Sequence, residues 1–186
     1  DLSAMADVTG ARMTALGDTR PVETLLGVPD VMNGGLIEIE AEALVGAAHS
    51  RRDIYTPDNR EYQTGYARAV VVGNRIYVAG CTATDSTGAV HDKGDWAGQY
   101  DYCHRNIQWA LEQAGATLDD VIRRRTFTVT NAEQNRPHGE GPGWFVNSRP
   151  VSLGCRITGL AHPDMLVEID AVAVKGAGEN IEWLKL

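Results

Sequence analysis

The sequence predicts an α+β fold in which helices cover one face of a mixed β-sheet. Two short runs rich in β-branched and aromatic residues flank Gly73-Asn74, and a longer run with helical periodicity follows them. Two further strand-like runs, 151–157 and 165–174, lie near the end of the chain. The 186 residues are 43% hydrophobic and 23% charged, which is typical of a globular domain and argues against disorder.

The first elements of the domain have local sequence signals. Residues 66–72 and 75–79 are predicted to form a β-hairpin, because Gly73-Asn74 between them suits a turn with positive φ. Asp95 can cap a helix that Gly115 then ends. Within that helix, side chains for the core recur every three or four residues: Trp96, Tyr100, Cys103, Ile107, Ala110 and Ala114.

The second half of the domain is predicted to add three strands. Residues 118–121 form a short turn into a strand at 122–130, and the Gly- and Pro-rich stretch 131–148 forms a loop or a short helix. In the last strand, 165–174, Glu168 and Asp170 point to the face opposite the apolar residues between them. We expect the apolar face to pack against the helices, and the acidic face to meet another subunit or line a cleft.

The chain also repeats part of itself. Residues 20–47 read RPVETLLGVPDVMNGGLIEIEAEALVGA and residues 149–177 read RPVSLGCRITGLAHPDMLVEIDAVAVKGA, with 10 of 28 aligned positions identical when one gap is allowed. Residues 1–47 are therefore predicted to be the C-terminal part of a first repeat, a helix plus two strands. Residues 48–52 are a junction, and residues 53–186 are a complete domain. Because unpaired strand edges favour aggregation, we expect a second chain or an upstream fragment to complete the first repeat.

Composition weighs against several classes of function. Seventeen Lys and Arg against 25 Asp and Glu give a net charge of −8, which disfavours a nucleic-acid partner because phosphates are bound by clustered cations. No apolar run approaches the roughly 20 residues of a membrane span, so no membrane partner is expected. The three cysteines lack C-x-x-C spacing and are expected to be free thiols in the cytoplasm. The five histidines lack metal-ligand spacing, so neither a metal nor a cofactor is expected.

Several separate motifs together resemble the RidA/YjgF superfamily. They are GYARAVVVGNRIYVAG, the helix residues Gln99 and Asn106, AGATLDDVI, and RPV followed by LVEIDAVAV, and they span nearly all of residues 51–177. The resemblance implies a chorismate-mutase-like fold and a trimeric homo-oligomer with ligand pockets between neighbouring domains. In the best-known branch it also implies hydrolysis of enamines and imines to keto acids and ammonia. With tandem copies, a trimer of paired domains or a pseudo-hexamer is expected.

The resemblance assigns a set of pocket residues. Glu168 matches the glutamate that orients or activates water, Tyr66 matches a pocket tyrosine, and Cys81 stands at a small or polar cleft position. The arginine that grips the substrate carboxylate in the deaminase branch is replaced by Ser152, and by Glu23 in the first repeat. A hydroxyl cannot replace a bidentate guanidinium, so ordinary 2-imino acids are not expected as substrates. The alternative interpretations are a structural carboxylate for Glu168 and a half-buried core ring for Tyr66.

Three hypotheses for function are considered. The first is a Rid-like deaminase or hydrolase that adds water to an atypical enamine, imine or planar amino compound. Glu168 would carry the proton, because apolar neighbours raise the pKa of a carboxyl group. His138, Glu140 and Trp144 in the loop HGEGPGW would cover the pocket. The alternative is a non-catalytic ligand-binding or assembly subunit, which the missing arginine favours; ribonuclease activity is the weakest candidate, because of the charge.

Overall fold

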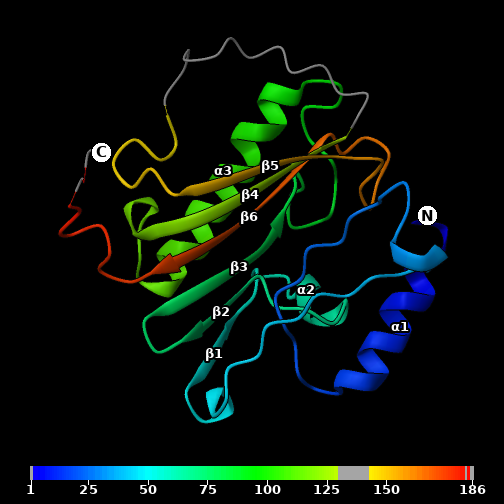
Figure 1. The fold of residues 1–186 in the computed structure, drawn as a ribbon, viewed down its shortest axis with the longest axis horizontal. Coiled ribbons are helices and arrows are strands. Elements are labelled where there is room, and N and C mark those ends of the chain that lie inside the picture. Colours follow the sequence, from blue (N-terminus) through cyan, green and yellow to red (C-terminus); the bar gives the residue numbers. More distant parts are fainter. Residues whose placement is uncertain (1, 130–142, 183, 185–186) are drawn as a thin grey trace.

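The computed structural model describes residues 2–129, 143–182 and 184, and its main feature is a six-stranded sheet (Figure 1). Short 3₁₀ turns accompany the regular elements at Leu2–Ala4, Met32–Gly34, Ala47–His49 and Leu118–Asp120. The helices and strands follow in the order α1 (Met5–Leu16), β1 (Arg51–Ile54), α2 (Arg60–Gln63), β2 (Ala69–Val72), β3 (Arg75–Cys81), α3 (Trp96–Ala114), β4 (Val121–Val129), β5 (Val151–Ile157) and β6 (Val167–Val174).

The sheet is mixed, as predicted. Its strand order is β1-β2-β3-β6-β4-β5, with β4 and β5 parallel and every other neighbouring pair antiparallel. The predicted hairpin is β2–β3, in which Ala69 lies opposite Val78 and the turn places Gly73 at φ 60°. This turn needs the positive φ that glycine adopts without a steric penalty.

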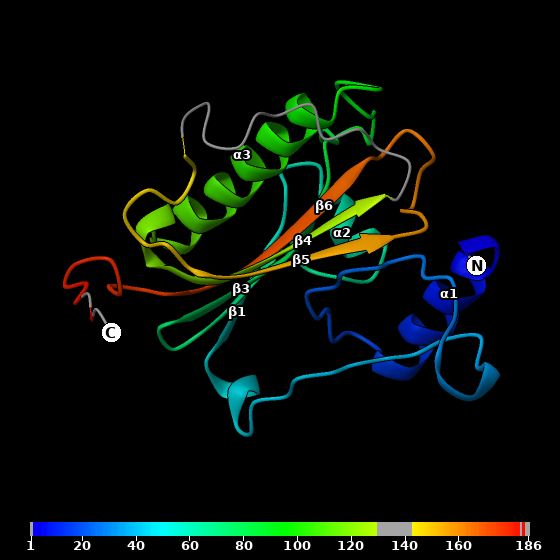
Figure 2. The ribbon, with the colours of Figure 1, turned by 45° about the horizontal axis from the view of Figure 1, so that its top comes forward.

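Helix α3 covers one face of the sheet, along the central strands (Figure 2). The Asp95 carboxylate accepts a hydrogen bond from the Ala97 N–H at 3.0 Å, and Gly115 ends the helix at φ 76°. Both predicted helix boundaries are confirmed. The apolar side of β6 packs against this helix, and its residues are at most 1% exposed: Val167, Ile169, Ala171 and Ala173. The described helices include none with the length and apolar character that crossing a membrane requires.

The N-terminal segment lies on the opposite side of the sheet from α3 (Figure 2). The helix expected near the start of the chain is present, as Leu2–Ala4 and α1. After α1, the chain crosses the sheet at the beginning of β2 and the end of β3. The Ala67 N–H donates to the Pro21 carbonyl at 3.0 Å, and the Gly80 N–H donates to the Glu23 carbonyl at 2.9 Å. Residues 20–24 therefore cover part of this face.

The two strands expected within residues 20–47 are not formed. Among the described residues, this segment makes a single β-bridge, between Gly27 and Gly159. Ile37 and Ile39 are 53% and 81% exposed, whereas the corresponding residues of β6 are fully buried. A strand needs a neighbouring strand to pair with, and apart from the Gly27–Gly159 bridge the described residues offer this segment none. The division of the chain into a partial repeat and a complete domain stays a prediction.

Asp120 joins the start of β4 to the end of β6. Its side chain is 6% exposed. One carboxylate oxygen accepts from the Thr117 N–H at 2.9 Å, and the other accepts from the N–H groups of Gly176 and Gly178 at 2.9 and 3.1 Å. One buried carboxylate therefore satisfies three backbone donors from two segments.

We predict that Asp120→Ala lowers the free energy of unfolding by about 3 kcal/mol, because three backbone N–H groups lose their acceptor. Urea denaturation followed by circular dichroism measures this. The matched control is Asp119→Ala: the neighbouring carboxylate accepts from the Asn147 side chain at the surface, and its loss should cost less than about 1 kcal/mol. Equal losses in the two variants would contradict the role given to Asp120.

Candidate functional site

Glu168 is a buried carboxyl group on the sheet face opposite α3. It is 7% exposed and lies against Gly80, where a Cβ atom would be only 1.7 Å from the Glu168 Oε1. Among the described residues, no donor makes a hydrogen bond to this carboxyl group. Burial, and then the charge of Asp170, raise its pKa to about 8, although Arg68 acts in the opposite direction. Glu168 is therefore a neutral carboxylic acid near pH 7 and has a proton to donate.

Arg68 connects four residues near Glu168. Its side chain is 12% exposed, and its Nη1 donates to the Gly80 carbonyl at 3.0 Å and to the Cys81 Sγ at 3.4 Å. Its Nη2 contacts the Tyr66 hydroxyl at 3.3 Å, and its Nε donates to the Glu61 Oε1 at 3.0 Å. The expected pocket residues Tyr66 and Cys81 thus lie together, with an arginine between them. The sequence signal that could have revealed it is a lone charge within the apolar run YARAV.

A second ion pair lies beside Glu168 on the same face. The Arg125 Nη2 donates to the Asp170 Oδ2 at 2.7 Å, and the Arg125 Nε lies 3.0 Å from both carboxylate oxygens. Asp170 is 4% exposed and also accepts from the Thr24 hydroxyl at 2.9 Å. The acidic face predicted for β6 is therefore covered in part by the N-terminal segment of the same chain.

Cys81 and Tyr66 hold their protons at neutral pH. Burial raises the pKa of the Cys81 thiol, and the nearby Arg68 only partly opposes this effect. Burial also raises the pKa of the Tyr66 hydroxyl. A buried thiol of this kind is a poor nucleophile, so Cys81 and Tyr66 are suited to shaping the site and donating hydrogen bonds.

Ser152 does not lie next to Glu168 within one chain. The register places Ser152 opposite Arg124, whereas Leu153 lies opposite Arg125, which in turn faces Asp170. Because side chains alternate along a strand, Ser152 points to the face that carries α3 and Glu168 points to the other. The Ser152 hydroxyl accepts from the Arg124 Nε at 2.9 Å.

Trp144 also lies on the α3 side of the sheet. Its Nε1 donates to the Asp101 carboxylate at 2.8 Å, and its ring stacks on His104 of α3 with the centroids 5.2 Å apart. The expectation that Trp144 covers the pocket of Glu168 is not met within one chain, because its indole finds both an aromatic partner and an acceptor on the helix. His138 and Glu140 lie outside the described residues.

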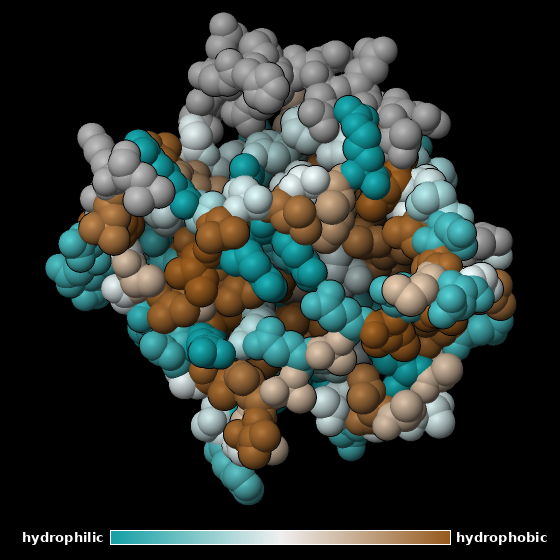
Figure 3. Space-filling model, in the orientation of Figure 1, coloured by the Kyte–Doolittle hydropathy of each residue, from teal (hydrophilic) through white to brown (hydrophobic). Residues whose placement is uncertain are grey.

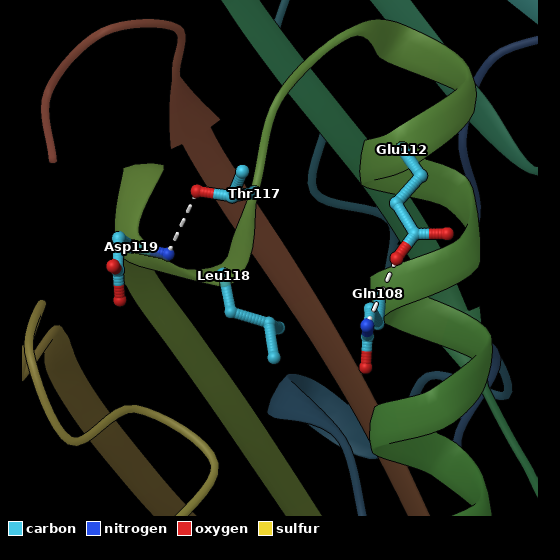
Figure 4. Close-up of a pocket in the computed structure, with 5 residues that line it drawn as sticks. All are labelled: Gln108, Glu112, Thr117, Leu118 and Asp119. Carbon is cyan, nitrogen blue, oxygen red and sulfur yellow. Dashed lines mark hydrogen bonds between the residues drawn. The ribbon is translucent and has the colours of Figure 1, made fainter.

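Two surface hollows lie away from Glu168. The one in Figure 4 lies between the end of α3 and the Leu118–Asp120 turn. Its polar side chains bond to close neighbours, with Gln108 donating to Glu112 at 2.9 Å. The other lies beside the start of β5. Within the described ranges, no group of three or more His, Cys, Asp or Glu side chains is placed to hold a metal ion.

The side of the molecule that carries Glu168 is chemically mixed. Figure 3 shows hydrophilic residues near its centre, with hydrophobic patches around them. Among the apolar side chains that the register assigns to this face, Val151 is 75% exposed and Leu153 is 51% exposed, both on the edge strand β5. An edge of this kind can meet another protein surface.

Comparison with known proteins places most of the domain in one family. A family model described as endoribonuclease L-PSP matches residues 58–175. A RutC family protein from Pyrococcus abyssi is 33% identical over 113 residues, which are 59% of this chain and 86% of that protein. The 3-aminoacrylate deaminase RutC of Acinetobacter baylyi is 32% identical over 108 residues, 58% of this chain and 85% of that protein.

A solved structure gives the same result. The crystal structure of a YjgF-family protein from Mycobacterium tuberculosis matches with a TM-score of 0.55 and 36% identity, and the match covers 67% of this chain and 99% of that one. The predicted α+β fold is thereby confirmed. The family-model match begins at residue 58, so residues 1–57 lie outside it.

We predict that Gly80→Ala lowers the free energy of unfolding by about 2 kcal/mol, because the new Cβ would overlap the buried Glu168 carboxyl group. Gly154→Ala is the matched strand control, since a Cβ there meets nothing within 4 Å and should change stability by less than about 0.5 kcal/mol. Thermal and urea denaturation of both variants test this. Equal stability of Gly80→Ala and Gly154→Ala would show that the Glu168 carboxyl group does not occupy the space beside Gly80.

We predict that Glu168→Gln changes how stability depends on pH. The ordinary pKa of this group is 4.5 and the folded value is about 8, so between these values the unfolded chain has lost a proton that the folded protein keeps. Raising the pH over this interval therefore destabilises the wild type by about 1.4 kcal/mol per pH unit through this group. The variant lacks this contribution, so its free energy of unfolding should rise relative to that of the wild type from pH 5 to pH 8. A constant difference across this range would show that Glu168 is not a buried neutral acid.

Proposed function

Because the chain belongs to the RidA/YjgF superfamily, we propose that it is a small-molecule deaminase that releases ammonia from an enamine or imine. The observation that carries this proposal is the buried Glu168 carboxyl group, whose pKa burial raises to about 8 and which lies near the Cys81 thiol. Arg68 links that thiol to the Tyr66 hydroxyl. The relative from Acinetobacter baylyi is named as a deaminase of an enamine, 3-aminoacrylate, which supports the same class of substrate for this chain.

The chemistry needs one acid and one water molecule. The Glu168 carboxyl group gives its proton to the carbon that is β to the enamine nitrogen, while the nitrogen lone pair forms a C=N bond. Water adds to the carbon of that bond and returns a proton to the Glu168 carboxylate. The resulting carbinolamine moves its hydroxyl proton to nitrogen and expels ammonia, leaving a carbonyl group. Enamine and water are consumed, carbonyl compound and ammonia are formed, and Glu168 ends as it began.

The substrate must reach Glu168 past residues 20–24. These residues bond through backbone carbonyls to Ala67 and Gly80, and through the Thr24 hydroxyl to Asp170. We propose that this segment opens for the substrate, or that a second copy in a trimer of paired domains completes the pocket. Position 152 is a serine and lies on the other face, so it cannot bind a substrate carboxylate beside Glu168. This favours a substrate that is uncharged, or one whose carboxylate binds elsewhere.

A non-catalytic binding or assembly subunit is the second candidate. It is favoured by the cover over Glu168, and by the Ser152 hydroxyl that replaces the arginine of the deaminase branch. Enamines that bind, as measured by calorimetry, without releasing ammonia would establish it. Degradation of RNA at a rate that falls with added salt would instead support the activity in the family model's description, which the charge of −8 disfavours.

We predict that the protein releases ammonia from a panel of enamines and imines that includes 2-aminoacrylate and 3-aminoacrylate. Glu168→Gln should lower kcat/KM at least about 100-fold, because the amide cannot donate and recover a proton. In the wild type, kcat/KM should be level below pH 8 and should fall tenfold per pH unit above it, as Glu168 loses its proton. Coupled detection of ammonia measures both.

Glu112→Gln is the matched control, since this exposed carboxylate lies on α3 and bonds only to the neighbouring Gln108 among the described residues. It should keep the wild-type rate. Turnover that is unchanged in Glu168→Gln would reject the role given to Glu168, and the absence of turnover across the whole panel would favour the binding subunit.

A further inference from the structure

Glu168 lies with four other charged side chains on this side of the sheet, and the five residues come from four parts of the chain. Glu168 and Asp170 lie on β6, Arg125 on β4, Arg68 just before β2, and Glu61 on α2. Other titratable groups near this cluster include Tyr66, Cys81 and Cys103, whose pKa values burial raises, and Cys155, which lies near Arg125. In the covering segment, Glu23 forms an ion pair with Arg12 of α1. Glu40 adds its charge at the side of Arg125.

Glu61 is fully committed to two partners. It is 2% exposed. Its Oε2 accepts from the Thr56 hydroxyl at 2.5 Å and from the Thr56 N–H at 3.2 Å, and its Oε1 lies 3.0 Å from both Nε and Nη2 of Arg68. Burial raises the pKa of Glu61, but the charge of Arg68 and the bonds from Thr56 outweigh this effect and lower it overall. Glu61 is therefore an ionised carboxylate, and hydrogen bonds to Thr56 and Arg68 fix the position of both its oxygens.

The buried charges balance only when Glu168 is neutral. Arg68 with Glu61 and Arg125 with Asp170 form two ion pairs whose charges cancel. An ionised Glu168 would add an unpaired negative charge to a region from which water is excluded, which is strongly unfavourable. A protonated Glu168 adds none.

Arg68 and Glu168 flank the same residue. The Arg68 Nη1 donates to the Gly80 carbonyl at 3.0 Å, and the Glu168 carboxyl group lies against the Gly80 Cα, in the space that a side chain would fill. The charge of the guanidinium therefore acts on Glu168, but its Nε and Nη2 are directed to Glu61.

We propose that Glu61 is a positioning residue for Glu168: by holding Arg68, it denies Glu168 a cation and keeps it in the acid form. This inference rests on the proposed function and deepens it, since it names Glu61 as the group that keeps Glu168 protonated. It concerns the ionisation of Glu168 itself, which can be measured whether or not the protein turns over a substrate.

The test is a pH titration of the side-chain carboxyl carbons by NMR, in full-length protein labelled with ¹³C at glutamate Cδ. Glu168 is assigned as the resonance that Glu168→Gln removes. In Glu61→Gln, Arg68 loses its charged partner and turns toward Glu168, so the titration midpoint of Glu168 should fall by at least about one pH unit. Glu61→Asp keeps the charge and should return the midpoint toward the wild-type value.

Asp53→Asn is the matched control, since it neutralises a different ion pair, with Arg51, at the edge of the sheet. It should leave the midpoint of Glu168 unchanged. If Glu61→Gln does not fold, Thr56→Val removes one bond that fixes Glu61 and should lower the midpoint by a few tenths of a pH unit. A midpoint that stays or rises in every folded variant overturns the inference. If the protein proves to be inactive but the midpoint falls, the proposed function fails and the role of Glu61 stands.

Discussion

The rest of the site depends on one close approach, that of the Glu168 carboxyl group to the bare backbone of Gly80. The contact removes the carboxyl group from water, and burial is the largest cause of its raised pKa. The Gly80 carbonyl also accepts a hydrogen bond from Arg68, and the Gly80 N–H donates to the Glu23 carbonyl. Strand β3, the residue before β2 and the N-terminal segment therefore meet at Gly80. The raised pKa of Glu168 therefore depends on the absence of a side chain at Gly80, as well as on the charged residues nearby.

Local signals in the sequence were enough to predict most of the domain. Gly73-Asn74 marks the hairpin, Asp95 and Gly115 bound the long helix, and the alternation along β6 assigns Glu168 to the face away from that helix. Each of these features depends on residues within a few positions of one another, where steric limits and capping act directly. The family resemblance adds Tyr66 and Cys81, which the structure places together around Arg68.

The features that sequence reasoning missed depend on contacts between distant segments. Whether Ser152 shares a face with Glu168 is decided by the register of β5 on β4 and of β4 on β6, and a shift of one residue would reverse the answer. Arg68 could not be identified as part of the site without knowing that Glu61 reaches it from α2. The two strands expected in residues 20–47 depend on neighbouring strands, and among the described residues this segment forms only the Gly27–Gly159 bridge.

The two copies of the motif RPV show that the neighbouring strands decide whether a segment forms a β-strand. Residues 149–151 lead directly into β5, which pairs with β4 and leaves Val151 exposed at the edge of the sheet. Within the part of the chain that the structure describes, residues 20–22 join no strand, and the carbonyls of Pro21 and Glu23 accept from the backbone N–H groups of Ala67 and Gly80. Nearly the same residues therefore form an open edge in one copy and a cover in the other. That cover is held by two backbone carbonyls and also by the Thr24 hydroxyl, which donates to Asp170. Access to Glu168 should therefore depend on the path of this backbone and, among its side chains, most on Thr24.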